Sequence, residues 1–249
     1  MISIVVPSYR DGLQAFVNSI DEALQEEYEL IVVSPFEVTV QSTPLMQECK
    51  VIVDRGSPSR CLQRGIIESS SDIFTWGTDD GIYFPETLKE ALVSFRTKTR
   101  KDGMVMRYTE EGPYSPMNGS VEEYYVAKNH EANRQPGIDP DWITAPVGMY
   151  HKDYFLELGG FDCRFEHINM NMHDYAYRLQ RDGGELIYSP SVVMHCNSDN
   201  FGEDHAILGT AFQLIDMPLF KEIYKDDSRE KTIDLDNWKQ APEVWRRFK

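Results

Sequence analysis

The sequence has no apolar run that approaches the roughly 20 residues that a membrane-spanning helix needs. Its opening stretch, MISIVVPSYR, also lacks the basic start and long apolar middle of a secretion signal. From these two absences we expect a cytoplasmic protein with no transmembrane segment.

Cysteine is scarce, and the four cysteines stand apart without any C-x-x-C pair: Cys49, Cys61, Cys163 and Cys196. Structural zinc sites and disulfide frameworks both show regular cysteine spacing, so this scatter argues against either. We expect four free thiols.

Clusters of positive charge are also missing. The formal net charge is −16, and no run of lysine or arginine interrupts it. Such a chain repels a phosphate backbone, so we expect no nucleic-acid partner. A negatively charged ligand would need a metal ion or a few well-placed arginines.

What the sequence does contain is a regular alternation of strand and helix patterns in its first hundred residues. At 249 residues with 41% apolar content, the chain can bury a sizeable core. Short β-branched runs predict strands, and apolar residues at helical spacing predict helices. The expected strands are 2–9, 28–35, 50–54 and 72–76, and the expected helices are 13–25, 58–70 and 85–98. This order is typical of a parallel sheet covered by helices.

The pattern fades over residues 103–145, which are rich in Gly, Pro, Asn and acidic residues. A segment of this length without a clear period is typical of a lid or a binding loop. Regularity returns with a helix at 174–183 and a strand at 185–195, and the chain beyond about 215 is amphipathic and charged.

The stretch IFTWGTDDG, residues 73–81, runs from a buried strand directly into two aspartates. Open α/β sheets bind their ligands at the carboxyl ends of parallel strands, where Asp79 and Asp80 are expected. Carboxylate oxygens suit Mg²⁺ or Mn²⁺, and such an ion can hold a diphosphate. The alternative is a solvated turn in which both carboxylates face water.

Several stretches in order resemble the landmarks of one family. ISIVVPSYR (2–10), IFTWGTDDGIYFPETL (73–88), and GMYHKDYFLELGGFDCRF (148–165) followed by DYAYRL (174–179) are similar to successive motifs of family 2-type glycosyltransferases with the GT-A fold. The resemblance covers residues 1 to about 197. It implies a Rossmann-like α/β domain, with a mostly parallel central sheet, flanking helices and a small antiparallel acceptor-side part.

On this resemblance, residues 1–215 form one glycosyltransferase domain. Residues 1–100 are its nucleotide-sugar-binding half and 101–215 its acceptor-side half. Residues 216–249 form a tail that we expect to be helical and packed on the domain or on a partner.

The resemblance also implies the donor site. In the family, the last carboxylate of an Asp-x-Asp motif holds the divalent cation of the nucleotide-sugar diphosphate. The alignment places Thr78 at the first position, Asp79 in the middle and Asp80 at the metal-holding position, with Mn²⁺ or Mg²⁺ as cofactor. Asp79 is then expected on the ribose or sugar of the donor, and Pro7 and Tyr9 belong to the donor site.

Two features of the donor site depart from the family or stay open. The aspartate that usually contacts the nucleobase is replaced by Ser34 and Pro35, so the donor nucleotide is not fixed. Arg60 and Arg64 are candidates for positive charge near the donor, with a surface-helix role as the alternative for at least one of them.

The catalytic base is the weakest part of the match. The family places an acidic pair before its D-L-x-x-R-L motif, and Asn171 and Met172 occupy these two positions. Because neither is acidic, the candidates for deprotonating the acceptor are, in order, Asp174, Glu166 and His173.

The remaining candidates lie around the second half of the chain. His195 ends a predicted strand at a position where many GT-A enzymes have a metal-binding histidine, with a structural role as the alternative, and His205 is a weaker candidate. Trp142 and Tyr150 flank the acceptor segment and are candidates for stacking on a sugar, with core packing as the alternative for one of them. Gly159 and Gly160 are expected to shape a tight turn.

The sequence therefore favours a metal-dependent, inverting transfer of a sugar from a nucleotide-diphosphate donor to a glycan or other hydroxyl acceptor, with homo-oligomerisation possible. The first alternative is an inactive domain that only binds a sugar nucleotide or glycan. The second is a nucleotidyltransferase, which the lack of a glycine-rich basic loop after the first strand disfavours. Hydrolysis of the donor separates enzyme from binding module, and pyrophosphate release would indicate the nucleotidyltransferase.

Overall fold

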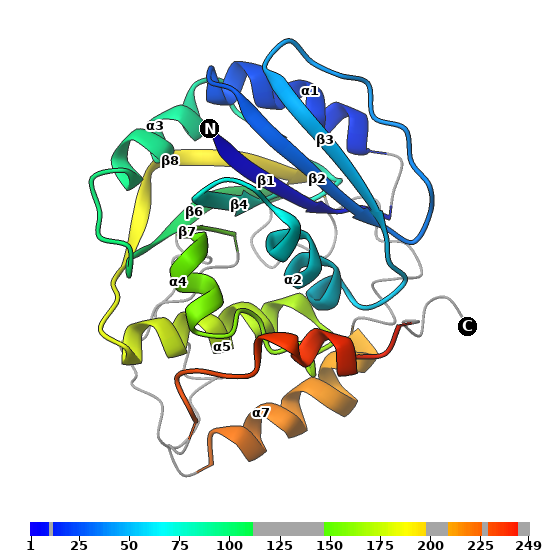
Figure 1. Cartoon of the computed structure of the whole chain (residues 1–249), viewed down its shortest axis with the longest axis vertical. Coiled ribbons are helices and arrows are strands. Elements are labelled where there is room, and N and C mark those ends of the chain that lie inside the picture. The colour runs from blue at the N-terminus through cyan, green and yellow to red at the C-terminus, as the bar shows by residue number, and fades with distance from the viewer. Residues whose placement is uncertain (10–11, 112–146, 198–208, 226–228, 244–249) are drawn as a thin grey trace.

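The computed structural model describes residues 1–9, 12–111, 147–197, 209–225 and 229–243. Its centre is an eight-stranded sheet in the order β3-β2-β1-β4-β7-β6-β8-β5 (Figure 1). The strands are β1 (Ile2–Pro7), β2 (Tyr28–Ser34), β3 (Met46–Val53), β4 (Ile73–Trp76), β5 (Gly81–Tyr83), β6 (Gly103–Glu111), β7 (Gly148–His151) and β8 (Leu186–Asn197).

The sheet has a parallel half and a mixed half. β3, β2, β1 and β4 run parallel to one another, so their carboxyl ends meet at one edge. β7 is antiparallel to both β4 and β6, β8 is parallel to β6, and β5 is antiparallel to β8. Every residue of β2 is buried, as expected for a strand covered on both faces.

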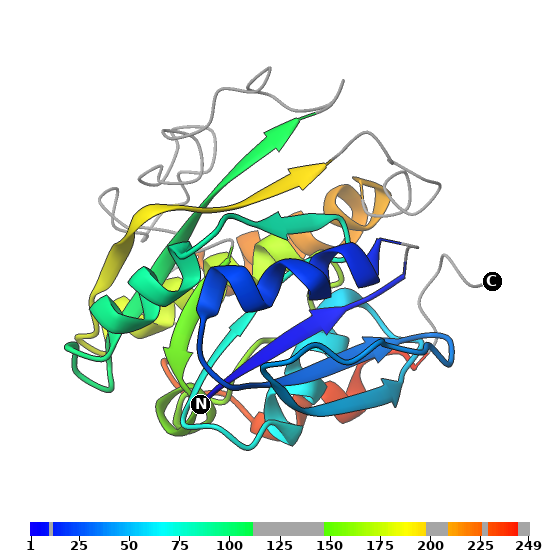
Figure 2. The same cartoon turned by 90° about the horizontal axis from the view of Figure 1, so that it is seen from above.

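Helices cover both faces of the sheet. In Figures 1 and 2, α1 and α3 lie on one side and α2, α4 and α5 on the other. The helices are α1 (Leu13–Leu24), α2 (Pro58–Glu68), α3 (Thr87–Phe95), α4 (Lys152–Glu157), α5 (Ile168–Arg181) and α7 (Met217–Ile223). The third helix begins at Thr87 and not at Pro85 as expected, because Glu86 takes a left-handed conformation with φ 65°. The predicted α/β architecture is confirmed.

An aromatic cluster fills the core beneath β4 and β7. The rings of Phe74, Trp76, Tyr150, Phe155 and Tyr175 are all buried, and each lies within ring-contact distance of at least two of the others. Tyr150 was a candidate for stacking on an acceptor sugar. It is only 2% exposed, so it packs in the core instead of facing a ligand.

The C-terminal part of the chain crosses the domain beside α2 and α5 (Figure 1). It contains the π-helical turn η3 (Phe212–Asp216), α7 and the short helix η4 (Leu235–Gln240). We call residues 229–241 the strap. Its Trp238 and Ala241 carbonyls accept hydrogen bonds from Arg60 on α2, and its Lys231 carbonyl accepts one from Arg178 on α5.

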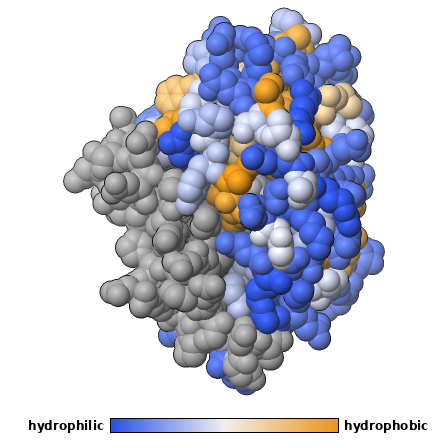
Figure 3. All heavy atoms as spheres, turned by 90° about the vertical axis from the view of Figure 1, so that its left-hand side faces the viewer, coloured by the Kyte–Doolittle hydropathy of each residue, from blue (hydrophilic) through white to orange (hydrophobic). Residues whose placement is uncertain are grey.

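On the face of the molecule at the left of Figure 1, the described residues are mostly hydrophilic, with small separate apolar patches (Figure 3). Within the described parts of the chain, no helix has the length and apolar character to cross a membrane.

Candidate functional site

The two adjacent aspartates lie in a tight turn between β4 and β5, at the carboxyl edge of the parallel strands. The turn is closed by the Gly81 amide, which donates to the Thr78 carbonyl at 3.0 Å, and it lies close to the start of α1. A Cβ on Gly12 would come within 2.1 Å of the Asp79 carbonyl oxygen, so only glycine permits this approach.

Asp79 and Asp80 have different surroundings although they are neighbours. Asp79 is 5% exposed, and its Oδ2 accepts the backbone N–H of Tyr9 at 2.6 Å and the Ser8 hydroxyl at 3.5 Å. Asp79 therefore ties the end of β4 to the end of β1. Asp80 is partly exposed and lies on the outer side of the same turn.

Two aromatic rings meet at the same edge of the sheet. Tyr9 follows β1 and Phe36 follows β2, and their rings stack with centroids 5.8 Å apart and planes 29° apart. The Phe36 backbone N–H donates to Oγ of the buried Ser34, which fixes the chain where β2 ends. Pro7, the last residue of β1, is partly buried beside them.

Arg60 and Arg64 both bind Asp54 at the end of β3. Arg60 Nε lies 3.0 Å from Asp54 Oδ1, and Arg64 Nη1 lies 2.9 Å from Oδ2. Burial alone would raise the pKa of Asp54, but hydrogen bonds from Arg60, the Gly56 N–H and Arg64 hold it below its usual range. Arg60 is buried and also holds the strap, which is a structural role and not the donor contact that was expected. A donor contact of Arg64 stays a prediction.

The end of β8 lies beside the aspartate turn. Cys196 pairs in register with Gly81, and its sulfur lies 3.7 Å from the Thr78 hydroxyl. His195 is partly exposed, and its Nδ1 lies 2.5 Å from the Thr109 hydroxyl on β6. Because side chains alternate along a strand, His195 points to the opposite face from Cys196.

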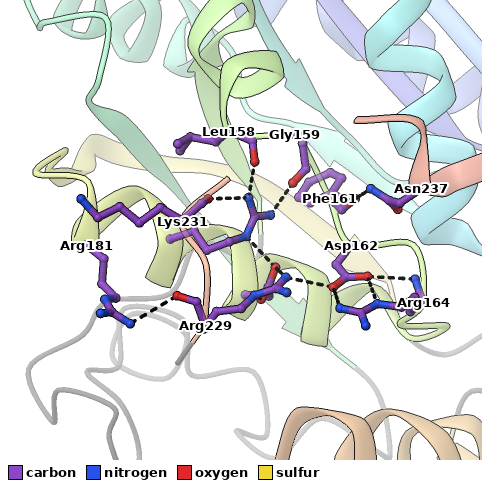
Figure 4. A network of polar contacts seen from close by, with 12 residues as sticks. Leu158, Gly159, Phe161, Asp162, Arg164, Arg181, Arg229, Lys231 and Asn237 are labelled. Carbon is purple, nitrogen blue, oxygen red and sulfur yellow. Dashed lines mark hydrogen bonds and ion pairs between the residues drawn. The ribbon is translucent and has the colours of Figure 1, made fainter. Parts of the chain in front are cut away.

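Asp174 lies in a buried network of ion pairs that includes Arg229 and Asp162, both labelled in Figure 4. It is fully enclosed, and it binds Arg178 at 2.8 Å and Arg229 at 2.8 Å and accepts the Tyr224 hydroxyl at 2.7 Å. Burial alone would raise its pKa, but the charges of Arg178 and Arg229 bring it to about 2. Arg229 also binds Asp162, which in turn binds Arg164.

This network does not suit a general base, although Asp174 was the first candidate. Both carboxylate oxygens are occupied, and an acid with a pKa of about 2 accepts a proton poorly near neutral pH. The Asp174 side chain instead links α5 to Arg229 of the strap.

Glu166 and His173, the other base candidates, lie around the start of α5 with Asp216. Glu166 is 7% exposed, and the backbone N–H groups of Glu166 and His167 donate to the two oxygens of Asp216 at 2.9 and 2.6 Å. Burial raises the pKa of Asp216 to about 6. Burial, with the nearby His167, lowers the pKa of His173 to about 4, so its imidazole is neutral near pH 7.

Several solved structures share this arrangement of strands and helices. TarS of S. aureus, residues 1–349, superimposes with a TM-score of 0.55 at 13% identity, over 92% of this chain and 71% of that one. The same fragment in complex with UDP gives 0.52 at 13%, over 90% and 69%. GalNAc-T7 with UDP, GalNAc and Mn²⁺ gives 0.56 at 10%, over 96% of this chain and 56% of that one. No protein-family model and no curated protein sequence matches the chain.

The chain has the GT-A fold. Within the GT-A fold, the aspartate turn at the end of β4 is where the sequence motifs placed the metal-holding carboxylate, and the role of Asp80 there stays a prediction. In the described part of the chain, no three His, Cys, Asp or Glu side chains gather to hold a metal. One carboxylate oxygen from Asp80 is still the ligand type that Mn²⁺ or Mg²⁺ takes when substrate phosphates and water complete its shell.

Some of the positions singled out from the sequence are buried, and others fall outside the described residues. Asn171 and Met172 are buried at 0% and 6% exposure, where the family has its acidic pair. Trp142 and His205 fall outside the described residues. Gly159 and Gly160 have φ values of 85° and 65°, which confirms the expected tight turn.

Two residues near the candidate sites escaped the sequence analysis. Asp216 comes from a π-helical turn far along the chain, and Phe36 stands one residue beyond the missing base-contacting position. A mid-chain π-helical turn has no simple sequence signal. The exposed aromatic after a buried strand was a signal that could have been used for Phe36.

Proposed function

We propose that this chain is a glycosyltransferase that moves a sugar from a nucleotide-diphosphate donor to a hydroxyl group of an acceptor, with inversion at the sugar carbon. The observation that carries the proposal is the pair Asp79–Asp80 in a turn at the carboxyl ends of β1 and β4 within a GT-A fold. TarS and GalNAc-T7, which share the fold, are described in complex with UDP, and this supports a nucleotide donor here.

In this proposal Asp80 holds Mn²⁺ or Mg²⁺. His195 binds Thr109 on the face of β8 opposite Cys196, which contacts the turn, so Asp80 is the protein ligand that the proposal names. A divalent cation at this place would neutralise negative charge on the leaving diphosphate as the bond to the sugar breaks. Asp79 keeps Tyr9 against the turn, so the donor meets a preformed surface made by the ends of β1 and β4. Arg64, which is partly exposed beside Asp54, is the remaining arginine for the donor side.

Glu166 takes the place of the general base, because Asp174 is engaged in its ion pairs and His173 has a low pKa. Its carboxylate would accept the proton of the acceptor hydroxyl as that oxygen attacks the sugar carbon. The backbone N–H groups of residues 166 and 167 donate hydrogen bonds to Asp216, and these bonds hold the segment in place.

A turnover assay tests the proposal. Release of nucleoside diphosphate is followed with UDP-, GDP- and dTDP-sugars, and release of nucleoside monophosphate with CMP-sugars, each with Mn²⁺ and with a chelator. We expect slow, metal-dependent hydrolysis of one donor even without acceptor. Hydrolysis by Asp80→Asn at the parent rate would contradict the role of the turn.

A second function has one observation in its favour. The positions of the family's acidic pair are held by Asn171 and Met172, and both are buried. A domain that binds a sugar nucleotide or glycan without turnover would likewise lack acidic residues at these two positions. Tight donor binding with no hydrolysis, and no change with Glu166→Gln, would favour the binding module.

A further inference from the structure

β3 is an edge strand of the sheet, and its outer side is open. It stands at the end of the strand order, so no strand in the described part of the chain pairs with that side. The loop that precedes β3 is held against α1. There the Gln41 N–H donates to Gln14 Oε1 at 2.8 Å, and the Thr43 hydroxyl donates to Asp21 Oδ1 at 2.7 Å. These contacts anchor the loop on the α1 side of the sheet.

The backbone groups at this edge point outwards at every second residue. The Asp54 N–H, just after β3, donates to the Ser34 carbonyl on β2 at 2.9 Å. N–H and C=O groups alternate in direction along a strand, so those of Cys49, Val51 and Val53 point away from β2. They are the groups that a further strand would bind.

The edge carries few of the features that keep edge strands from pairing. Protected edges are short, or they carry proline, bulges or several charges. β5, at the other end of the sheet, has only three residues. β3 shifts its register against β2 between Met46 and Glu48, but it is regular from Glu48 to Val53 and has no proline or glycine. Val51 and Val53 are 40% and 47% exposed, although valine is usually buried.

A second copy of β3 matches this edge when the two strands run antiparallel about Val51. Val51 then lies opposite Val51 of the second copy, and Cys49 lies opposite Val53. These side chains share one face of the strand and are exposed, so the apolar row meets itself. On the other face, the apolar stem of Lys50 lies opposite Ile52.

The two neighbouring registers are less favourable. A pair centred on Lys50 would place the two Lys50 side chains directly opposite each other, and like charges in this position are destabilising. A pair centred on Cys49 would place Val51 opposite Gln47, which lies in the irregular start of β3. The pairing about Val51 avoids both problems.

The charged residues at the two ends of this pairing are complementary. Glu48 of one copy, whose side chain is 56% exposed, lies opposite Asp54 of the other. Asp54 is bound by Arg60 and Arg64, and the Arg64 side chain is still 32% exposed. Each Glu48 therefore meets an ion pair with an accessible arginine and not a bare carboxylate.

We propose that two copies of this chain associate through β3 into a reversible dimer, with the two β3 strands antiparallel about Val51 and the two sheets joined into one. The interface consists of one short strand from each copy, so it belongs to the small class of interfaces that are weak and transient. The inference is independent of the proposed function, because a chain without transferase activity would present the same edge.

Sedimentation velocity of the full chain over a range of concentrations tests the association. At about 0.15 M salt, which screens the repulsion between two copies of net charge −16, the fraction of dimer should rise with concentration. Val51→Lys is expected to weaken the dimer about tenfold or more, because two lysines would face each other at its centre.

A matched control separates the edge from the rest of the surface. Val93→Lys makes the same change at a valine on α3 that is 53% exposed, and it should associate like the parent. A parent that stays monomeric at every concentration would overturn the inference, as would equal weakening by the two variants. Thermal unfolding of each variant shows whether the fold is kept.

Disulfide formation tests the register. Two cysteines can be bridged only when their Cα atoms lie within about 7 Å, which holds for residues directly opposite each other in antiparallel strands. The other three cysteines are buried, so Cys49→Ala leaves no exposed thiol. In that background, Val51→Cys is expected to form a covalent dimer under mild oxidation. This small change also preserves the test if Val51→Lys does not fold.

The parent provides the comparison for this experiment. In the proposed pairing its two Cys49 residues lie about 13 Å apart along the strands, so the parent is not expected to form a covalent dimer. A covalent dimer of the parent, with none in the Val51→Cys variant, would overturn the pairing about Val51.

Discussion

Two acidic regions of this molecule differ in what compensates the charge of their carboxylates. Asp162 and Asp174 are buried among Arg164, Arg178 and Arg229, so their charges are neutralised by partners within the fold. The Asp79–Asp80 turn lies at the edge of the sheet, where Asp79 binds a backbone N–H and a hydroxyl. Carboxylates paired with buried arginines serve stability, whereas a ligand role for the partly exposed Asp80 at the end of β4 stays a proposal.

Removal of the charge of Asp174 should have the largest effect on stability. Asp174→Asn leaves Arg178 and Arg229 buried with less compensation, and we expect a loss of about 3 to 5 kcal/mol in the free energy of unfolding. Urea unfolding followed by circular dichroism measures it. The control, Asp236→Asn, breaks an exposed pair with Lys239 and should cost less than about 0.5 kcal/mol. Equal effects in the two variants would contradict the distinction.

The opposite behaviour is expected at the turn. Asp80→Asn should leave the free energy of unfolding within about 0.5 kcal/mol of the parent, because the residue is partly exposed. Turnover should fall roughly 100-fold or more, because charge on the leaving group is no longer stabilised. Urea unfolding and donor hydrolysis, measured on the same preparation, separate the two effects. A clear loss of stability in Asp80→Asn would show that Asp80 supports the fold and would contradict its proposed role at the turn.

The pH dependence of stability provides a third comparison, between Asp216 and Asp174. Folding raises the pKa of Asp216, so the stability that its protonated carboxyl contributes is fully present below pH 3.8 and is lost as the pH rises through about 6. Folding lowers the pKa of Asp174, so the stability that its ionised carboxylate contributes is lost as the pH falls from 3.8 towards 2.

Between pH 4 and 7, the parent should therefore lose about 2 kcal/mol of stability relative to Asp216→Asn. Urea unfolding of both proteins at unit steps of pH measures the difference. A difference that is flat across this range would show that Asp216 is ionised in the fold throughout.

The smallest effects are expected at the two arginines of α2. Arg60→Lys loses the paired contacts with Asp54 and one bond to the strap, and should cost about 1 to 2 kcal/mol. Arg64→Lys changes a partly exposed contact and should cost less than about 1 kcal/mol. If Arg64 contacts the donor, Arg64→Lys will also weaken nucleotide binding while Arg60→Lys does not, and titration calorimetry distinguishes them.

Local patterns predicted most of the fold, because alternation of β-branched runs with helical spacing is visible within short windows of sequence. They also placed the aspartate turn at a strand end, since that position depends only on β4. Local patterns did not predict the buried ion pairs of Asp174 and Arg60. Their partners, Arg229 and the Trp238 carbonyl, lie 55 and 178 residues further along the chain. For Tyr150 the sequence left sugar stacking and core packing open, because its neighbours in the aromatic cluster come from several separate elements.

The strap also has a consequence for how the chain folds during synthesis. Arg60 on the second helix is bound to a carbonyl 181 residues later, and Asp174 is paired with an arginine that is made 55 residues later. While the chain is still being translated, the parallel half of the sheet can assemble, but α5 carries buried charges whose partner has not yet left the ribosome. The buried charges of α5 are therefore expected to stay uncompensated in the nascent protein until Arg229 has emerged.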